Sequence, residues 1–326
     1  MCIEVHANTR QDLHPNPADD AVQVIFLFLK DERHPEEPPL ALQPPEKDIV
    51  ISWGDPTNRG HVKGAQYIEA ADELDLFNHF IEVVLNLDPD MLLGFETQKN
   101  SLGYLIERYR SAYGLNLCQE ISRIQVLSSR RKDGFADEHH EGWEYRHSSG
   151  IHITGRNVLN VWRILKSDIA LTSYSYENFV FHVLHERVPY YSFETLTHFY
   201  TQTRPSQRWR DFDHYLARTH KTFDFIAKLD VVDQTSEFAR VFGTDFFSIL
   251  TRGSQYKVES VMLRVSKANN FIALSPSAQQ VRVFVSFFSS FSCSFSFSFS
   301  FSFSSFFISF SRFLLLFLSG HNLLCP

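Results

Sequence analysis

The sequence up to about residue 282 predicts an α/β fold, in which helices pack on a mostly parallel or mixed sheet. Short runs of apolar residues, bounded by polar or turn-forming residues, indicate buried strands. Longer segments carry apolar residues at helical spacing and indicate amphipathic helices. The two kinds of segment alternate along the chain, and this alternation is typical of helices that cover a central sheet.

Several short segments predict the strands of this sheet. The clearest is AVQVIFLFL at 21–29, because a continuous apolar run is typical of a strand that is buried on both faces. In chain order the predicted strands are 2–6, 21–29, 47–53, 90–95 and the first part of 151–168.

The predicted helices lie between and after these strands. The segment 69–87 has an apolar stripe at helical spacing, formed by residues 74, 76, 77, 80, 81, 84 and 85. The segment 100–114 predicts a helix that Gly114 ends, because glycine readily adopts the left-handed conformation that closes many helices. The polar segment 130–150 predicts an exposed loop. Further helical segments are the second part of 151–168, 175–187, 212–230, 235–243 and a stretch from Lys257 on.

Composition and charge limit the classes of function. The chain has 326 residues, of which 44% are hydrophobic and 21% charged, as in an ordinary soluble globular protein. Its net charge of −7 excludes a polycation, so any nucleic-acid site has to be a local basic patch. The four cysteines lack the spacing of a metal site, and no signal peptide is evident. A reduced intracellular compartment is therefore expected.

The last segment, 283–326, differs from the rest because phenylalanine and serine alternate along much of it. This period of two would form a strand with an all-phenylalanine face, which would aggregate if exposed. Phe and Ser can both be encoded by pyrimidines alone, so a translated pyrimidine-rich intron would give the same repeat. We favour this interpretation over a disordered or aggregating tail and over a membrane-spanning segment. The predicted fold therefore ends near Arg282.

Two segments have the setting in which a two-metal exonuclease places its carboxylates. Such an enzyme needs several carboxylates around two Mg²⁺ ions about 4 Å apart. In CIEVH (2–6) Glu4 is present, but Cys2 stands where the first aspartate is expected. In GFETQKNSLGYL (94–105), where a strand runs into a loop and then a helix, Ser101 stands at the position of a second aspartate.

A third segment, HYLARTH (214–220), has the setting of the Tyr-xxx-Asp motif on a late helix. Thr219 follows Tyr215 at the aspartate position, and Arg218 takes that position if the register shifts by one residue. Of the four expected carboxylates only Glu4 remains. One carboxylate cannot hold two hard cations that each need several oxygen ligands. We therefore expect no metal site and no exonuclease activity here.

These motifs belong to a longer resemblance. The chain resembles the exonuclease-like region of the B-family DNA polymerases, and within that family it is most similar to the zeta branch. The stretch TRGSQYKVES (251–260) is the most specific part, whereas the strand-and-loop pattern DPD-x-LLG is shared across the family. The resemblance covers about residues 2–281, and its main segments are 3–17, 87–108, 152–189 and 229–280.

The resemblance implies an RNase H-like 3′-5′ exonuclease fold, with a mixed sheet flanked by helices. It divides the chain into a degenerate exonuclease-like domain (1–240), a helical linker that leads to a polymerase palm (241–282), and the Phe/Ser tail (283–326). A degenerate exonuclease site is also expected in the zeta branch.

Several features of the family are absent from the sequence. The palm motifs that carry the polymerase aspartates do not follow residue 282, and the cysteine motifs that bind metal and accessory subunits are not found. We therefore expect an internal piece of a larger polymerase that cannot itself transfer a nucleotide. It is expected to hold no cofactor; Mg²⁺ and an iron–sulfur cluster belong to the missing parts of the parent.

The segment 250–267 is the candidate nucleic-acid interface. Arg252, Tyr256, Lys257 and Arg264 lie along it, and cations in such a segment can neutralise template phosphates in a salt-dependent way. The alternative is a solvated helix face. In that case the apolar side of the helix packs inward, through Val258, Met262 and Val265.

Two hypotheses about function follow. In the first, the parent is a zeta-type polymerase that copies damaged DNA in the nucleus, with DNA and accessory subunits as partners and no membrane. This region is then a non-catalytic scaffold that positions DNA. In the second, the chain is a stand-alone nucleic-acid-binding or interaction module without enzymatic activity.

Overall fold

The computed structural model describes residues 1–10, 13–31, 46–54, 64–124, 150–202 and 205–271. The predicted tail, and all of the predicted loop 130–150 except Gly150, lie outside these residues. The chain divides into two compact units, the first from Met1 to Glu237 and the second from Phe238 on. The division falls within helix α9 (Val231–Phe242), the helix that also contains the predicted domain boundary after residue 240.

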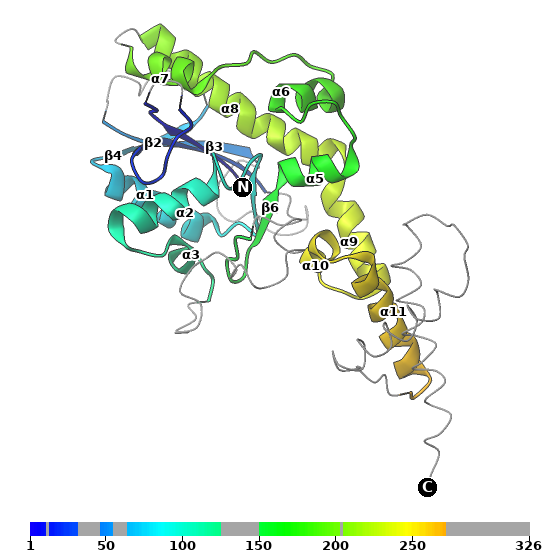
Figure 1. Cartoon of the computed structure of the whole chain (residues 1–326). Helices are drawn as coiled ribbons and strands as arrows, with labels where there is room; N and C mark the ends of the chain where they lie inside the picture. The colour runs from blue at the N-terminus through cyan, green and yellow to red at the C-terminus, as the bar shows by residue number, and fades with distance from the viewer. Residues whose placement is uncertain (11–12, 32–45, 55–63, 125–149, 203–204, 272–326) are drawn as a thin grey trace, which may run out of the picture. The chain divides into compact units, whose positions relative to one another are not determined.

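A six-stranded mixed sheet forms the centre of the first unit (Figure 1). The strand order is β4-β3-β2-β1-β5-β6, so β1 lies inside the sheet. Strands β1, β2 and β3 pair antiparallel, whereas β5 with β1, β6 with β5 and β4 with β3 are parallel. The strands are β1 (Cys2–Ala7), β2 (Val22–Lys30), β3 (Glu46–Trp53), β4 (Gln66–Ala70), β5 (Met91–Gly94) and β6 (Asn157–Asn160). The predicted mixed sheet is thus confirmed.

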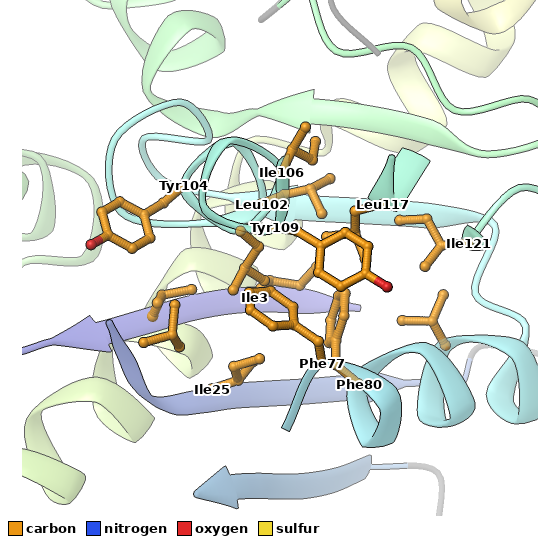
Figure 2. Packing of buried hydrophobic residues seen from close by; sticks show 14 of the residues in the cluster. Ile3, Ile25, Phe77, Phe80, Leu102, Tyr104, Ile106, Tyr109, Leu117 and Ile121 are labelled. Carbon is orange, nitrogen blue, oxygen red and sulfur yellow. The ribbon is translucent and has the colours of Figure 1, made fainter. Parts of the chain in front are cut away.

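One face of the sheet is covered by α1 (Glu73–Leu87), α2 (Leu102–Tyr113) and α3 (Leu117–Glu120). Figure 2 shows Phe77 and Phe80 of α1 meeting Ile3 and Ile25 of the sheet in this core. All four side chains are fully buried, and burial of such apolar side chains is the main stabilising contribution to folding. Asp72 caps α1 by accepting a hydrogen bond from the backbone N–H of Asp75.

The opposite face of the sheet is covered by α7 (Phe193–Thr201) and the long helix α8 (Pro205–Lys228) (Figure 1). Phe26 of β2 stacks on Tyr215 of α8, with 4.9 Å between the ring centroids. The shorter helical elements of this unit are α5 (Val161–Asp168), α6 (Tyr176–Phe179) and a π-helical turn, η2 (Val180–Leu184).

Three elements of the first unit were not predicted. Strand β4 lies partly where the helix 69–87 was expected to begin, because Asp72 starts the helix only after the chain has paired with β3. The strand is short and polar, as is common at the edge of a sheet. Helix α7 and the short α3 were also missed, since neither carries a long apolar stripe.

The second unit contains the end of α9, α10 (Phe246–Thr251) and α11 (Ser254–Ala268). The Arg264 side chain of α11 donates a hydrogen bond to the Val241 carbonyl at 2.7 Å, and the Ser260 hydroxyl donates one to the Phe242 carbonyl at 2.8 Å. No side chain of α11 is fully buried. Within the described ranges of the chain, no helix is both long and apolar enough to span a bilayer.

Candidate functional site

Strand β1 brings Cys2, Glu4 and His6 to the face of the sheet that α8 covers. Side chains alternate between the two faces of a strand, so Ile3 and Val5 point into the opposite core. Cys2, Glu4 and His6 are each 1% exposed or less. Two polar side chains thus lie buried at the centre of the domain and need partners there.

Glu4 has an ion-pair partner on α8. The Nε of Arg218 donates a hydrogen bond to Oε2 of Glu4 at 3.1 Å, and the two side chains are 14% and 1% exposed. Burial raises the pKa of Glu4, and the guanidinium of Arg218 opposes that rise. Burial by itself would lower the pKa of Arg218, but Glu4 and neighbouring groups raise it above its ordinary value. Arg218 is therefore a permanent cation beside Glu4.

Aromatic rings hold the Arg218 guanidinium in place. It lies over the ring of Tyr176 at 4.4 Å from the centroid and over that of Phe95 at 5.3 Å. Contacts with ring faces are favourable for a guanidinium and leave its N–H edges available. A second carboxylate, that of Glu96, is close enough for its charge to raise the pKa of both Glu4 and Arg218. The centre is therefore one cation beside two carboxylates.

Ser101 is fully buried at the start of α2, and its hydroxyl donates a hydrogen bond to the Ile3 carbonyl at 2.5 Å. The residue thus joins the loop to β1. The space around it is tight, since a Cβ added to Gly94 would lie 2.3 Å from the Ser101 Oγ. A hydroxyl that donates to the backbone in a tight space is a structural group, in the place where a carboxylate was expected.

The two remaining predicted positions, Cys2 and Thr219, are also buried. Burial raises the pKa of the Cys2 thiol far above its ordinary value, so the sulfur stays protonated. The Thr219 hydroxyl donates a hydrogen bond to the Leu216 carbonyl of its own helix at 2.8 Å. Arg218, one residue earlier, is the α8 residue that contacts Glu4.

A cavity of about 390 Å³ lies beside this centre, and Arg218 is one of the residues that line it. Lys221 lines it too and forms an ion pair with Glu186, while Arg210 lies over the ring of Phe199 at 6.0 Å. The full lining is Tyr176, Val188, Pro189, Tyr191, Arg210, Asp213, His214, Ala217, Arg218 and Lys221. The volume is within the range of small-molecule sites, and the lining combines cations with aromatic rings.

Comparison with known proteins accounts for this arrangement. Residues 1–179 match the family model described as DNA polymerase family B, exonuclease domain. The chain belongs to this family. The mixed sheet with flanking helices is therefore its RNase H-like α/β fold, as predicted.

Individual relatives show which members of the family the chain is similar to. The chain is 38% identical over 290 residues to the human DNA polymerase zeta catalytic subunit. This alignment covers 86% of the chain and 9% of the human protein. It is 35% identical over 289 residues to the Saccharomyces cerevisiae counterpart, over 86% of the chain and 19% of the relative. Against the Plasmodium falciparum DNA polymerase delta catalytic subunit the identity is 28% over 211 residues. The chain thus matches the exonuclease-like region of zeta-type polymerases and spans a small part of their length.

The family's exonucleases use divalent metal ions, and this centre does not fit them. No cluster of three or more metal-ligating side chains occurs in the described parts of the family-B domain or of the second unit. Glu4 and Glu96 face a guanidinium, and Ser101 directs its proton to the Ile3 carbonyl. Hard divalent cations need more oxygen ligands and no adjacent positive charge.

Glu4 and Ser101 are predicted from the sequence motifs, and Arg218 is predicted only as the alternative under a one-residue shift. Glu96 is not predicted from the sequence. The sequence feature that could have indicated Arg218 is a basic residue three positions after Tyr215 on the predicted helix. For Glu96 it is the acidic side chain directly after the buried strand β5. Because neither residue type matches the catalytic pattern at its position, the pattern alone could not select them.

Asp211 of α8 is a second buried ionisable group, close to His6. Its Oδ1 lies 3.5 Å from the Nδ1 of His6, and neither carboxylate oxygen has a hydrogen-bond partner among the described residues. Burial raises the pKa of Asp211 well above its ordinary value of 3.8 and lowers the pKa of His6 to about 4. Burial therefore favours the uncharged form of both groups.

We expect Asp211→Asn to stabilise the fold increasingly as the pH rises. With its pKa raised in the folded state, Asp211 contributes stability only at low pH, and that contribution is lost as the pH rises above 3.8. Burial is the main cause of the lowered His6 pKa, so we expect the His6 contribution to change little between the two proteins. Urea unfolding at pH 5 and pH 8 measures it, with Asp213→Asn on the same helix as the matched control. A constant difference between the two pH values would contradict this assignment.

The predicted nucleic-acid interface lies in the second unit. Tyr256 is 42% exposed, Lys257 is half-buried, and Arg264 is exposed while bonded to the Val241 carbonyl. Arg252 follows the last turn of α10. The inward packing of the apolar side is wrong for the described residues, because Val258 and Val265 are 45% and 49% exposed and Met262 is only half-buried. A solvated helix face without phosphate contacts stays the alternative.

Proposed function

We propose that this chain is a non-catalytic exonuclease-like scaffold of a zeta-type DNA polymerase, which holds DNA without cleaving it. The observation that carries the proposal is the ion pair between Arg218 and Glu4, the one carboxylate that remains of the expected exonuclease motifs. A centre with a fixed guanidinium, a protonated thiol and a hydroxyl bonded to the backbone has no means to activate water.

Binding of DNA is supported by the cations on the two units. Arg210, Arg218 and Lys221 line the cavity of the first unit, and Lys257 with Arg264 lies on α11 of the second. Positively charged groups bind phosphates through release of counterions, so binding should weaken as salt rises. Loss of cleavage in such a scaffold would let a polymerase keep mismatched or lesion-distorted ends, and we propose that the parent acts in error-prone translesion synthesis.

The wider setting of the parent is also a proposal. Because the relatives are DNA polymerase catalytic subunits, we propose that the parent acts on DNA in the nucleus together with accessory subunits. Its polymerase chemistry would need Mg²⁺ and palm carboxylates, and we propose that these, like an iron–sulfur cluster, are held by segments other than this chain.

The test of this function combines a nuclease assay with a binding assay on the full chain. A 3′-labelled single-stranded oligonucleotide is incubated with Mg²⁺ or Mn²⁺, and fluorescence anisotropy follows binding of the same strand. We expect binding with no cleavage above that of the Glu4→Ala variant. Metal-dependent degradation that Glu4→Ala abolishes would show an active nuclease instead, and absence of binding at low salt would remove the scaffold function.

Lys257→Ala should weaken DNA binding and lower its salt dependence. If Lys257 contacts one phosphate, its loss lowers the slope of log affinity against log salt by about one and weakens binding several-fold at about 0.1 M salt. Anisotropy titrations at four salt concentrations measure this slope. Lys228→Ala, an exposed cation at the end of α8, is the control. Equal slopes for Lys257→Ala and the unmodified chain would assign α11 to a solvated face without phosphate contacts.

A further inference from the structure

The Arg218 side chain has unused hydrogen-bond donors at the edge of the cavity. Only its Nε is bonded to Glu4, and the two Nη groups have no hydrogen-bond acceptor among the described residues. The guanidinium also lies over the rings of Tyr176 and Phe95, which are cation–π contacts and provide no hydrogen-bond acceptor for the Nη groups. The side chain is 14% exposed, and its Nη groups are not among the buried polar atoms that lack a partner. They are therefore accessible to a ligand that accepts hydrogen bonds from them.

The surroundings of these donors favour an anion. The lining carries three cations, Arg210, Arg218 and Lys221, and one carboxylate, that of Asp213. Arg218 is paired with Glu4 and Lys221 with Glu186. Tyr176, Tyr191 and His214 add ring surfaces on which a nucleobase can stack. A phosphate with an attached base satisfies both parts of this lining, because guanidinium groups bind phosphate oxygens in a matching planar geometry.

We propose that Arg218 takes the electrostatic place of the metal ion: it pairs with Glu4 through Nε and binds a phosphate of single-stranded DNA in the adjacent cavity through its Nη groups. Binding at this centre is then independent of divalent metal. The inference rests on the proposed function and deepens it, since it names the residue that holds the strand and the reason why no metal is needed. Arg218 acts here as a binding residue, with no bond of the DNA broken.

The experiment compares two variants of the full chain that differ only in this cation. Glu4→Gln keeps Arg218 and a hydrogen-bond acceptor beside it. Glu4→Gln/Arg218→Met also removes the cation, and the glutamine at position 4 leaves no unpaired carboxylate there. Binding of tetrathymidylate is measured by isothermal titration calorimetry in EDTA and in Mg²⁺. Circular dichroism verifies that both variants are folded.

We expect the unmodified chain to bind tetrathymidylate equally in EDTA and in Mg²⁺. The double variant should bind about tenfold more weakly than Glu4→Gln, which is the loss expected for one charge-assisted contact. Equal affinity of the two variants, or binding that requires Mg²⁺, would overturn the inference. Thymidine monophosphate that binds as tightly as the oligonucleotide would also overturn the assignment to a DNA strand.

The outcomes separate this inference from the proposed function. A longer single strand that binds the full chain with the same affinity in both variants would leave the scaffold function standing and remove Arg218 from it. Absence of binding by the unmodified chain to any strand would instead remove the scaffold function itself.

Discussion

Arg218→Met is expected to destabilise the folded domain by about 3–5 kcal/mol at pH 7, which is typical for removal of one partner of a buried ion pair. The physical reason is that Glu4, 1% exposed, would either keep a buried carboxylate without a counter-charge or take up a proton, and both cost free energy at pH 7. Methionine retains much of the length of the arginine stem and its contacts with the rings of Tyr176 and Phe95. Urea unfolding followed by circular dichroism measures the loss.

The destabilisation of this variant should depend on pH. Arg218 opposes the rise of the Glu4 pKa that burial causes, so its removal raises that pKa further. The folded variant then retains a proton that the unfolded chain releases above its ordinary pKa of 4.5. Stability relative to the unmodified chain therefore falls as the pH rises from 5 to 8. Glu4→Gln/Arg218→Met serves as the control and should recover most of the loss. If the double variant is as unstable as Arg218→Met, the loss of stability comes from altered packing and not from the charge on Glu4.

Restoring the missing carboxylates should not restore metal binding while Arg218 is present. The variant Cys2→Asp/Ser101→Asp/Thr219→Asp regains the acidic side chains of the exonuclease motifs, but the guanidinium still occupies the ion-pair position at Glu4. A divalent cation would have to lie beside a fixed positive charge, so we expect no bound Mn²⁺ in electron paramagnetic resonance spectra. Addition of Arg218→Ala to these three substitutions should produce a bound Mn²⁺ signal.

The comparison between these two carboxylate-restored variants is matched, because they differ at one residue. Circular dichroism with and without Mn²⁺ establishes whether each is folded, and the variant with Arg218→Ala should gain thermal stability when the metal is added. Equal Mn²⁺ binding by both variants would mean that the lost carboxylates alone explain the inactive site. In that case the cation at Arg218 plays no part in excluding metal.

Much of the fold followed from the sequence, because its strands are long apolar runs. The predicted segment 21–29 overlaps β2 except for one residue at each end, 47–53 lies within β3, and Gly114 ends α2 with a positive φ of 68°. The polar edge strand β4 carried no comparable signal. Its pairing with β3 depends on contacts between segments distant in sequence, and such tertiary contacts override local preference.

The missing carboxylates of the candidate site could be predicted from the sequence, but the ion pair between Arg218 and Glu4 could not. Cys2 and Ser101 stand at motif positions, so the absent carboxylates could be identified from spacing alone. The pairing of Arg218 with Glu4 joins residues 214 positions apart. Only the packing of α8 across β1 brings them together, and no local pattern encodes that contact. The same argument applies to Asp211 and His6, which meet across the same two elements.

A titration of the full chain with Mn²⁺, followed by electron paramagnetic resonance, tests most directly whether a guanidinium has replaced the metal ion. We predict that the signal intensity of free Mn²⁺ decreases no more with the unmodified chain than with the Glu4→Gln variant. A protein-bound signal that appears with the unmodified chain and disappears with Glu4→Gln would contradict it. Such a result would place a metal ion at Glu4 and reopen the possibility of nuclease chemistry at this centre.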